Sequence, residues 1–224
     1  MPEQTALDEI RDDASSRKRF LKMVGGGGAA SLGILLAACG SDNKKKASTG
    51  AAAAPASDTT TTAAAGMDGD IAIVNYALTL EYLEAEFYKE AIKTGFFKGA
   101  QLSLIKEIGD HERQHVNALT AAVKQLGGTP ATKPKTKFPL SDAKTIVKTA
   151  QAVENLGAAA YLGQAAKIKN KDILAAALSI HSVEARHAAA LNTLVGKDIT
   201  PDGAFAKPAT MEEVLPVAKM FIVG

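Results

Sequence analysis

The chain has 224 residues, with 26 Lys and Arg against 24 Asp and Glu, so its formal net charge is +2. This near-balance excludes the concentrated basic surplus of a typical nucleic-acid-binding domain, and we expect no nucleic-acid partner. The single cysteine excludes a disulfide framework, a cysteine-ligated zinc site and an iron–sulfur cluster.

The first predicted element is an export signal over residues 1–38. A polar stretch ends in the basic segment 16–22, Ser-Arg-Lys-Arg-Phe-Leu-Lys, and a run of Gly, Ala, Ser and aliphatic residues follows it to Ala38. That run is shorter than the ~20 apolar residues of a membrane span and is typical of a signal. The basic segment resembles a twin-arginine signal with Lys18 in place of the second arginine, so the twin-arginine route and the general secretion route both stay open.

The only cysteine, Cys39, comes directly after this signal. Residues 36–39, Leu-Ala-Ala-Cys, resemble a lipobox, which predicts lipidation of Cys39. The alternative is a chance cysteine in an apolar segment that is cut elsewhere. Residues 39–67 are rich in Ala, Thr and Ser and predict a flexible tether. We therefore expect an exported lipoprotein, anchored in the membrane of the cell envelope and facing outside the cytoplasm.

The segment 68–196 predicts four amphipathic helices, at about residues 70–94, 101–126, 141–169 and 172–195. Glycines follow the first, second and fourth helices, Ser141 is the expected N-cap of the third, and Asn170 is its expected left-handed stop. The connection between helices two and three is long and contains three prolines, which favours an all-α four-helix bundle with a crossover at that point.

The tail, residues 197–224, predicts a short fifth helix that covers one end of the bundle. A capping-box pattern begins at Thr210, but Pro216 lies too deep for a straight helix from that cap. Either the helix kinks or it begins at Pro216.

The apolar stripe of each bundle helix has one glutamate near its middle: Glu81, Glu112, Glu154 and Glu184. A carboxylate in a core is costly unless it is paired, and no Lys or Arg lies on these stripes. His115 and His187 follow the second and fourth glutamates on the same helix faces. Two divalent cations would balance the four negative charges, so the pattern favours a dinuclear metal site.

The spacing of these groups repeats. Tyr88 follows the first glutamate as Tyr161 follows the third, and a shift of 72 or 73 residues places every group of the first half on its counterpart in the second half. A duplicated helical hairpin with two-fold pseudo-symmetry follows, which holds two metals in equivalent halves. A lone Glu-x-x-His on a helix is usually a solvated pair, and the alternative for the whole set is a bundle that keeps the pattern and binds no metal.

The pattern Glu-x6-Tyr, Glu-x-x-His, found twice within residues 70–196, resembles the ligand pattern of the ferritin-like superfamily in its bacterioferritin and rubrerythrin forms. The segments 80–88 and 183–187 are similar to those of exported ferritin-like proteins described as desiccation-related. The resemblance implies a ferritin-like bundle, with Tyr88 and Tyr161 hydrogen-bonded to ligand carboxylates and expected to take part in catalysis. It implies six metal ligands: Glu81, Glu112, His115, Glu154, Glu184 and His187.

An oxygen-rich site with imidazoles suits two Fe ions, with Mn possible. The expected chemistry is oxidation of Fe²⁺ or scavenging of peroxide at the cell envelope. The chain has no cysteine-rich electron-transfer domain, so an enzyme of this kind needs an external electron donor. The tether favours a monomer or small oligomer over a closed cage. The alternative function is a non-catalytic metal-binding or structural, stress-related envelope protein with a vestigial site.

The other polar residues near the stripes allow simpler interpretations. His111 and His181 are expected to be half-buried structural histidines, although His111 shares a face with His115 and can instead contact the ligands. Glu84, Glu86 and Asp110 are expected to be charges on solvated faces.

Overall fold

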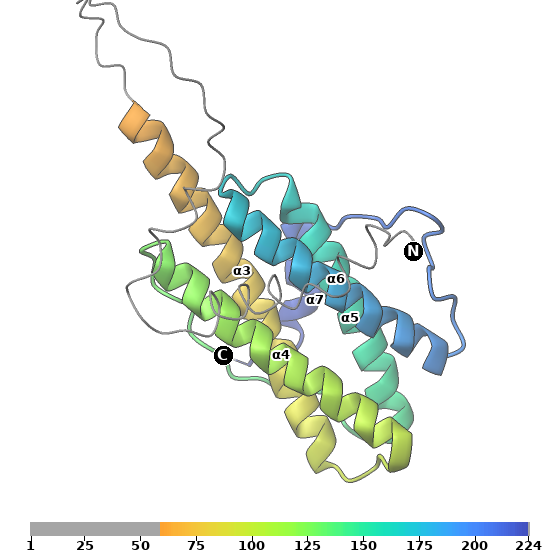
Figure 1. Cartoon of the computed structure of the whole chain (residues 1–224). Coiled ribbons are helices and arrows are strands. Elements are labelled where there is room, and N and C mark those ends of the chain that lie inside the picture. Colours follow the sequence, from red (N-terminus) through yellow and green to blue (C-terminus); the bar gives the residue numbers. More distant parts are fainter. Residues whose placement is uncertain (1–58, 224) are drawn as a thin grey trace, which may run out of the picture. The chain divides into compact units, whose positions relative to one another are not determined.

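The structure is a computed structural model, and it describes residues 59–223. The predicted signal, Cys39 and most of the predicted tether lie outside the described residues. The described part of the chain forms five helices: α3 Thr59–Lys93, α4 Gly99–Gln125, α5 Ala143–Ala165, α6 Lys171–Leu194 and α7 Met211–Lys219 (Figure 1). The prediction of an all-α fold is confirmed. Among the described helices, none combines the length and the apolar character that crossing a membrane requires.

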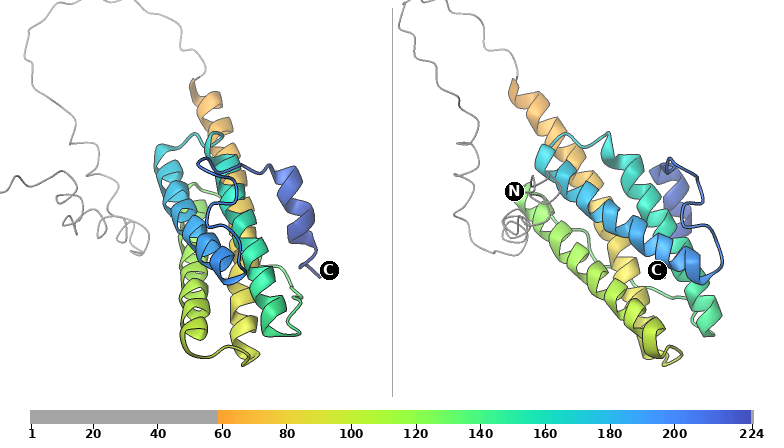
Figure 2. Two further views of the ribbon diagram at one scale, coloured as in Figure 1. Left: turned by 90° about the vertical axis from the view of Figure 1, so that its right-hand side faces the viewer. Right: turned by 45° about the vertical axis from the view of Figure 1, so that its right-hand side comes forward.

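Helices α3 to α6 form the bundle, and the two helices of each hairpin run antiparallel (Figures 1 and 2). The connection 126–142 returns along the bundle, so that α5 starts at the end where α4 starts. The tail fastens this crossover, because Lys137 N donates to Phe221 O at 2.9 Å and Val223 N donates to Lys135 O at 3.0 Å.

The ends of three helices follow the predicted glycine stops. Gly95, Gly127 and Gly196 have φ of 72°, 81° and 74°. These values lie in the left-handed region, where a glycine carries no Cβ penalty. The stops after α3, α4 and α6 are therefore confirmed.

The two ends of α5 differ from the prediction. Asp142, not Ser141, is its N-cap, and its side chain accepts a hydrogen bond from Thr145 N at 2.8 Å. The helix ends at Ala165, and Asn170 has an ordinary φ of −75° and caps α6 instead. The buried carboxylate of Asp70 on α3 accepts hydrogen bonds from the backbone N–H groups of Lys169 and Asn170, at 2.8 and 2.7 Å. Because these N–H groups bind the Asp70 carboxylate, the chain turns here and α5 does not continue.

Helix α3 begins at Thr59, earlier than the predicted residue 70, so residues 59–67 of the predicted tether are helical. Alanine, which is frequent there, has the highest helix propensity. Helix α7 begins at Met211 under a complete capping box between Thr210 and Glu213, and it continues through Pro216. The alternative prediction, that the helix begins at Pro216, is therefore wrong.

Helix α7 lies along the side of the bundle beside α5, not over one end as predicted (Figure 2). Its buried residues Val214 and Ala218 pack on apolar side chains of α3 and α5. A Cβ on Gly163 would lie 1.9 Å from the carbonyl oxygen of Ala209, so the bare glycine lets the tail run directly over α5. Ala209 N donates to Ala159 O at 2.9 Å and fixes this contact.

Besides the cluster that α7 covers, two apolar clusters fill the four-helix bundle. One gathers around Leu78, Leu119 and Ile180, and the other around Phe87, Ile105 and Leu191. The predicted glutamates of the four stripes lie on the chain between residues of these two clusters. This arrangement places a buried acidic layer in the middle of the bundle.

Candidate metal centre

The acidic layer receives one glutamate from each bundle helix. Glu81 on α3, Glu112 on α4, Glu154 on α5 and Glu184 on α6 are each 0 % exposed. The two histidines, three residues after the α4 and α6 glutamates, are 8 % and 5 % exposed. Burial between two apolar clusters removes the water that would otherwise solvate these charges.

The structure brings the six predicted ligands together as two overlapping groups. In each group, one ligand atom per residue lies within 4.8 Å of every other. Glu112 and Glu184 belong to both groups. One group adds Glu81 and His115, and the other adds Glu154 and His187.

Three carboxylate oxygens surround one nitrogen of His115. Its Nδ1 lies 3.2 Å from Glu81 Oε2, 3.3 Å from Glu112 Oε2 and 3.0 Å from Glu184 Oε1. One N–H group cannot donate well to three oxygens at once. The four atoms converge as they would around a cation.

His187 makes the matching arrangement in the other half of the bundle. Its Nδ1 lies 3.0 Å from Glu112 Oε1 and 3.1 Å from Glu154 Oε2, while Glu184 Oε2 is 4.0 Å away. The two histidines therefore face the shared glutamates from opposite helices, as the internal repeat predicts.

The shared glutamates have oxygens that no described group satisfies. Oε1 of Glu112 and both oxygens of Glu184 are buried and accept no well-oriented hydrogen bond, although a histidine nitrogen lies within 3.0 Å of two of them. Buried acceptors without partners are rare and costly. Two divalent cations would supply these missing partners and balance the four carboxylates, so the donor set fits a dinuclear metal site.

The two tyrosines connect the halves. Tyr88 on α3 donates to Glu154 Oε1 at 2.6 Å, and Tyr161 on α5 donates to Glu81 Oε1 at 2.5 Å. Each hydroxyl thus orients the glutamate that belongs to one metal group only. The structure makes both hydrogen bonds that the sequence resemblance implies.

Burial and mutual repulsion perturb the pKa values of these acids. Burial, followed by repulsion from the other carboxylates, raises the pKa of Glu112 and of Glu184 well above the usual range. Burial acts in the same direction on Glu81, but attraction and hydrogen bonds from His115 outweigh it and lower the pKa of Glu81. Burial opposes the charge on His115, yet its acidic neighbours raise its pKa far above the ordinary value. Without metal, the layer therefore retains protons.

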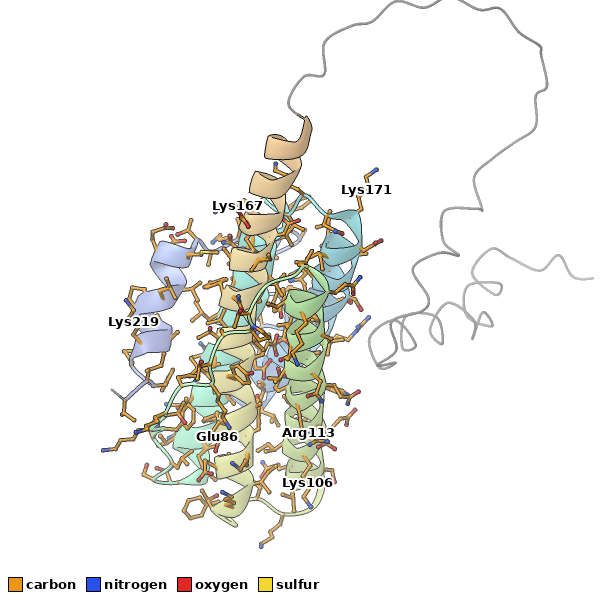
Figure 3. The ribbon with its side chains drawn as sticks, turned by 90° about the vertical axis from the view of Figure 1, so that its left-hand side faces the viewer. Glu86, Lys106, Arg113, Lys167, Lys171 and Lys219 are labelled. Carbon is orange, nitrogen blue, oxygen red and sulfur yellow. The ribbon has the colours of Figure 1, made fainter. Side chains whose placement is uncertain are left out.

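Glu84 corrects one prediction, because it is buried and not on a solvated face. Its residue is only 2 % exposed. Glu86 and Asp110 were also predicted to lie on solvated faces, and the structure agrees with that more closely than it does for Glu84. Glu86 is ion-paired with Lys89 and Lys133, and Asp110 is 61 % exposed beside Arg113. Figure 3 shows Glu86 and Arg113 on the outside of the bundle.

His111 touches the site and His181 does not. His111 is half-buried, its ring stacks on that of His187, and its Nδ1 lies 3.0 Å from Nε2 of His187. This contact leaves Nδ1 of His187 directed at the carboxylates and fixes its ring orientation. Nδ1 of His181 lies 3.0 Å from the carbonyl oxygen of Ala158, which is a structural hydrogen bond.

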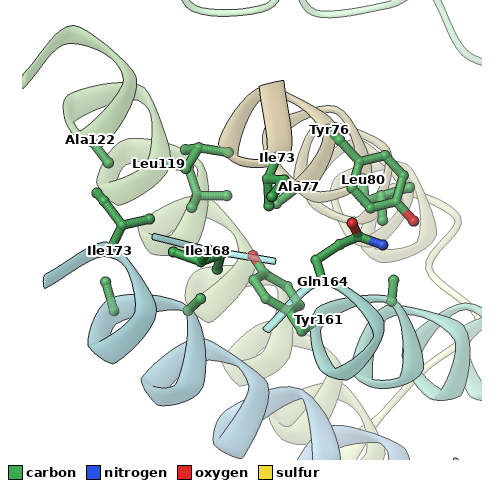
Figure 4. A pocket seen from close by; sticks show the side chains of 14 residues that line it. Ile73, Tyr76, Ala77, Leu80, Leu119, Ala122, Tyr161, Gln164, Ile168 and Ile173 are labelled. Carbon is green, nitrogen blue, oxygen red and sulfur yellow. The ribbon is translucent and has the colours of Figure 1, made fainter. Parts of the chain in front are cut away.

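A small apolar cavity of about 30 Å³ adjoins Tyr161 and was not anticipated (Figure 4). The side chain of Gln164 is 3 % exposed and has no hydrogen-bond partner among the described groups, and neither has the hydroxyl of Tyr76. Figure 4 shows Gln164 and Tyr161 together at this cavity. An ordered water of the usual size fits there and can serve these polar atoms.

A polar network lies between α5 and α6, one turn from Glu154. Gln151 donates to the side-chain oxygen of Asn192 at 2.7 Å, and Asn155 donates to the same oxygen at 3.0 Å. Lys197 closes the network by donating to Gln151 at 3.1 Å. The sequence analysis missed this network, because single amides on a helix carry no pairing signal.

Comparison with known proteins gives the family. Residues 69–197 match the family model that is described as a ferritin-like domain. The chain belongs to this ferritin-like family. The match includes all six predicted ligands, and the buried Glu and His groups of this ferritin-like domain can bind metal ions. A search of curated proteins found no matching relative.

Proposed function

We propose that this ferritin-like protein is an exported metalloprotein, anchored to the cell envelope through Cys39, whose buried site holds two Fe ions, with Mn as the alternative. The site oxidises Fe²⁺ or removes peroxide outside the cytoplasm. The ligands are the six Glu and His residues of the two overlapping groups.

One observation carries the metal assignment. Glu112 and Glu184 belong to both groups, and their unpartnered oxygens are buried between His115 and His187. Two ligand groups that share these two carboxylates would hold two cations close together. A purely structural acidic core would need a Lys or Arg partner for each charge, and the hydrogen bonds and ion pairs of these six residues include none.

The bound metals would supply one-electron redox chemistry, and the residues of this chain control its protons. With two Fe²⁺ ions held by these six residues, the site would supply the two electrons that, with two protons, reduce one peroxide to two waters. The acids with raised pKa values, Glu112 and Glu184, release their protons when cations bind. Tyr88 and Tyr161 hold the unshared glutamates in place, and either lies close enough to exchange an electron with the site.

Export and anchoring rest on the sequence features of residues 1–39. Because the chain has no cysteine-rich electron-transfer domain, an external donor must return electrons to the site. Protein folded inside the cell and exported by the twin-arginine route would carry metal already loaded there.

The test is peroxide consumption by the full-length chain after anaerobic loading with Fe²⁺. We expect one peroxide to be consumed for every two Fe²⁺ ions oxidised. A loaded protein that leaves peroxide and O₂ untouched contradicts catalysis and favours the alternative, a non-catalytic metal-binding or structural envelope protein. Glu154→Gln, which removes a ligand of one group, is expected to slow the oxidation of Fe²⁺ by peroxide.

A further inference from the structure

Gln164 on α5 is a buried amide to which the proposed metal centre gives no role. The residue is 3 % exposed, and neither its side-chain oxygen nor its nitrogen has a hydrogen-bond partner among the described residues. An amide can donate two hydrogen bonds and accept two more, so its burial without partners is costly. Gln164 lines the cavity of about 30 Å³ beside Tyr161, together with Tyr76, whose hydroxyl is buried without a described partner as well (Figure 4).

The internal repeat explains why there is space at this place. A shift of 72 residues places Leu104 and Ile105 of α4 on Ala176 and Ala177 of α6. The two large side chains belong to the apolar cluster around Phe87, whereas the two alanines line the cavity. The cavity therefore lies in the half of the bundle where small residues replace large ones.

The same repeat shows that packing does not require an amide at position 164. A shift of 73 residues places Ala91 of α3 on Gln164, and Ala91 is completely buried among apolar side chains. A leucine or methionine at position 164 would fill similar space and leave no polar atom without a partner. Apart from Gln164 and the two tyrosines, the cavity is lined by Ala, Val, Leu and Ile. The unpartnered amide therefore points to a polar guest in an otherwise apolar cavity.

The size of the cavity and its polar atoms restrict the guest. One water takes about 10–15 Å³ of such space, so the cavity has room for about two oxygen atoms. Hydrogen peroxide has this size, is neutral, donates through two O–H groups and accepts at both oxygens. Dioxygen has the size but donates no hydrogen bond and accepts poorly, so it would leave Gln164 and Tyr76 without partners.

Tyr161 connects the cavity with the candidate metal centre. Its side chain lines the cavity, and its hydroxyl donates to Oε1 of Glu81 at 2.5 Å. Three other lining residues, Ile73, Tyr76 and Ala176, are only half-buried. The cavity therefore lies between the surface of the bundle and the tyrosine that holds a ligand glutamate.

We propose that this cavity binds the hydrogen peroxide that the metal site reduces, with Gln164 and Tyr76 as its hydrogen-bonding residues, an inference that rests on the proposed function. Peroxide takes the place of water there and is held beside Tyr161. The two polar residues favour peroxide over dioxygen, because only peroxide satisfies them.

The direct test is diffraction from crystals of the metal-free, full-length chain soaked in hydrogen peroxide. Peroxide is not consumed without metal, so it can be observed where it binds. We expect electron density for two bonded oxygens within hydrogen-bond distance of Gln164 and Tyr76, and only water there before soaking. Water alone after soaking would overturn the inference. Uptake of xenon under pressure without uptake of peroxide would also overturn it, since it would mark a dry apolar cavity suited to dioxygen.

Substitutions in the Fe²⁺-loaded, full-length chain give a second readout. Gln164→Leu removes the amide at similar size, and Tyr76→Phe removes only the hydroxyl. Gln164→Leu should raise the peroxide concentration for half-maximal oxidation at least ~tenfold, and Tyr76→Phe should raise it less. Each should affect the limiting rate less than this concentration, and oxidation by dioxygen less than oxidation by peroxide. The metal-free Gln164→Leu variant should melt no lower than the wild type, because it loses a buried amide without partners.

Two matched controls make the same changes outside the cavity. Gln125→Leu alters an exposed amide at the end of α4, and Tyr82→Phe removes a hydroxyl of α3 that does not line the cavity. Both should keep the half-maximal peroxide concentration of the wild type.

Failure of the inference and failure of the proposed function give different results. If the loaded wild type consumes peroxide and Gln164→Leu keeps its half-maximal concentration, the cavity is not the peroxide site and the metal chemistry stands. If soaked crystals hold peroxide in the cavity but the loaded wild type consumes none, the proposed reduction of peroxide fails.

Discussion

Substitution of Glu112 should affect both metals, whereas substitution of Glu81 should affect one. Glu112 belongs to both overlapping groups, and Glu81 belongs only to the group of His115. We therefore expect Glu112→Gln to remove nearly all metal-induced stabilisation and Glu81→Gln to remove about half of it. Glu107→Gln, an exposed change on the same helix as Glu112, is the control and should keep all of it.

The size of the effect follows from mass action. A metal present at a hundred times its dissociation constant stabilises the folded state by about 2.7 kcal/mol per site, so two sites give roughly 5 kcal/mol. For a domain of this size, each kcal/mol raises the melting temperature by about 2–4 °C. Loading should thus raise the melting temperature of the wild type by roughly 10–20 °C, that of Glu81→Gln by about half as much, and that of Glu112→Gln hardly at all.

Without metal, the melting temperatures of the wild type and of Glu112→Gln should be in the opposite order. Burial and repulsion raise the pKa of Glu112 well above its usual range, so a neutral amide there relieves an unfavourable charge. Glu112→Gln should accordingly melt higher than the wild type without metal and lower with it. Scanning calorimetry of apo and Co²⁺-loaded samples measures both differences. Equal losses for Glu81→Gln and Glu112→Gln would refute the assignment of Glu112 as a shared ligand.

Three further predictions test other parts of the account. In the metal-free protein, the raised pKa values of Glu112 and Glu184 mean that the folded state binds more protons. Its free energy of unfolding should therefore fall as the pH rises above 4.5, the ordinary pKa of a glutamate. The fall is about 1.4 kcal/mol per pH unit for each extra proton that the folded state binds, and urea titrations at several pH values measure it. Gly163→Ala should destabilise the fold by about 1–3 kcal/mol, because its Cβ would meet a backbone carbonyl of the tail, and limited proteolysis should then release α7. His111→Val should weaken the ion held by His187 by roughly 10–100-fold, and unchanged Co²⁺ affinity would show that the stacked ring does not orient the ligand.

The six ligands were predictable because they break an otherwise apolar pattern in a repeated way. Glu112 and His115 alone are a common pair on a helix surface, but their exact counterparts in Glu184 and His187 are not expected by chance. The repeat also predicts the two-fold arrangement of the bundle. The internal duplication therefore carried more information than any single motif.

Glu84 could not be assigned correctly from its own helix. The sequence analysis expects it on a solvated face, whereas the structure buries it on the inner face of α3. The signal lies elsewhere in the chain, in the glycine that replaces its counterpart at position 157. The space beside a glycine is a property of two packed helices and not of either sequence segment.

Helix ends were predicted where they depend on local residues and missed where they depend on distant ones. The glycine stops at Gly95, Gly127 and Gly196 need only a left-handed backbone, which glycine adopts readily. The end of α5 depends on Asp70, a residue of α3 that binds the backbone of residues 169 and 170. That contact exists only in the folded bundle.

The most direct test of the dinuclear site is the metal content of the protein itself. The chain should be produced with its signal intact, purified without chelators and analysed for elements. The account predicts about two Fe or Mn ions per chain, as the two overlapping ligand groups require. A content near zero, both as purified and after anaerobic reconstitution, would contradict it.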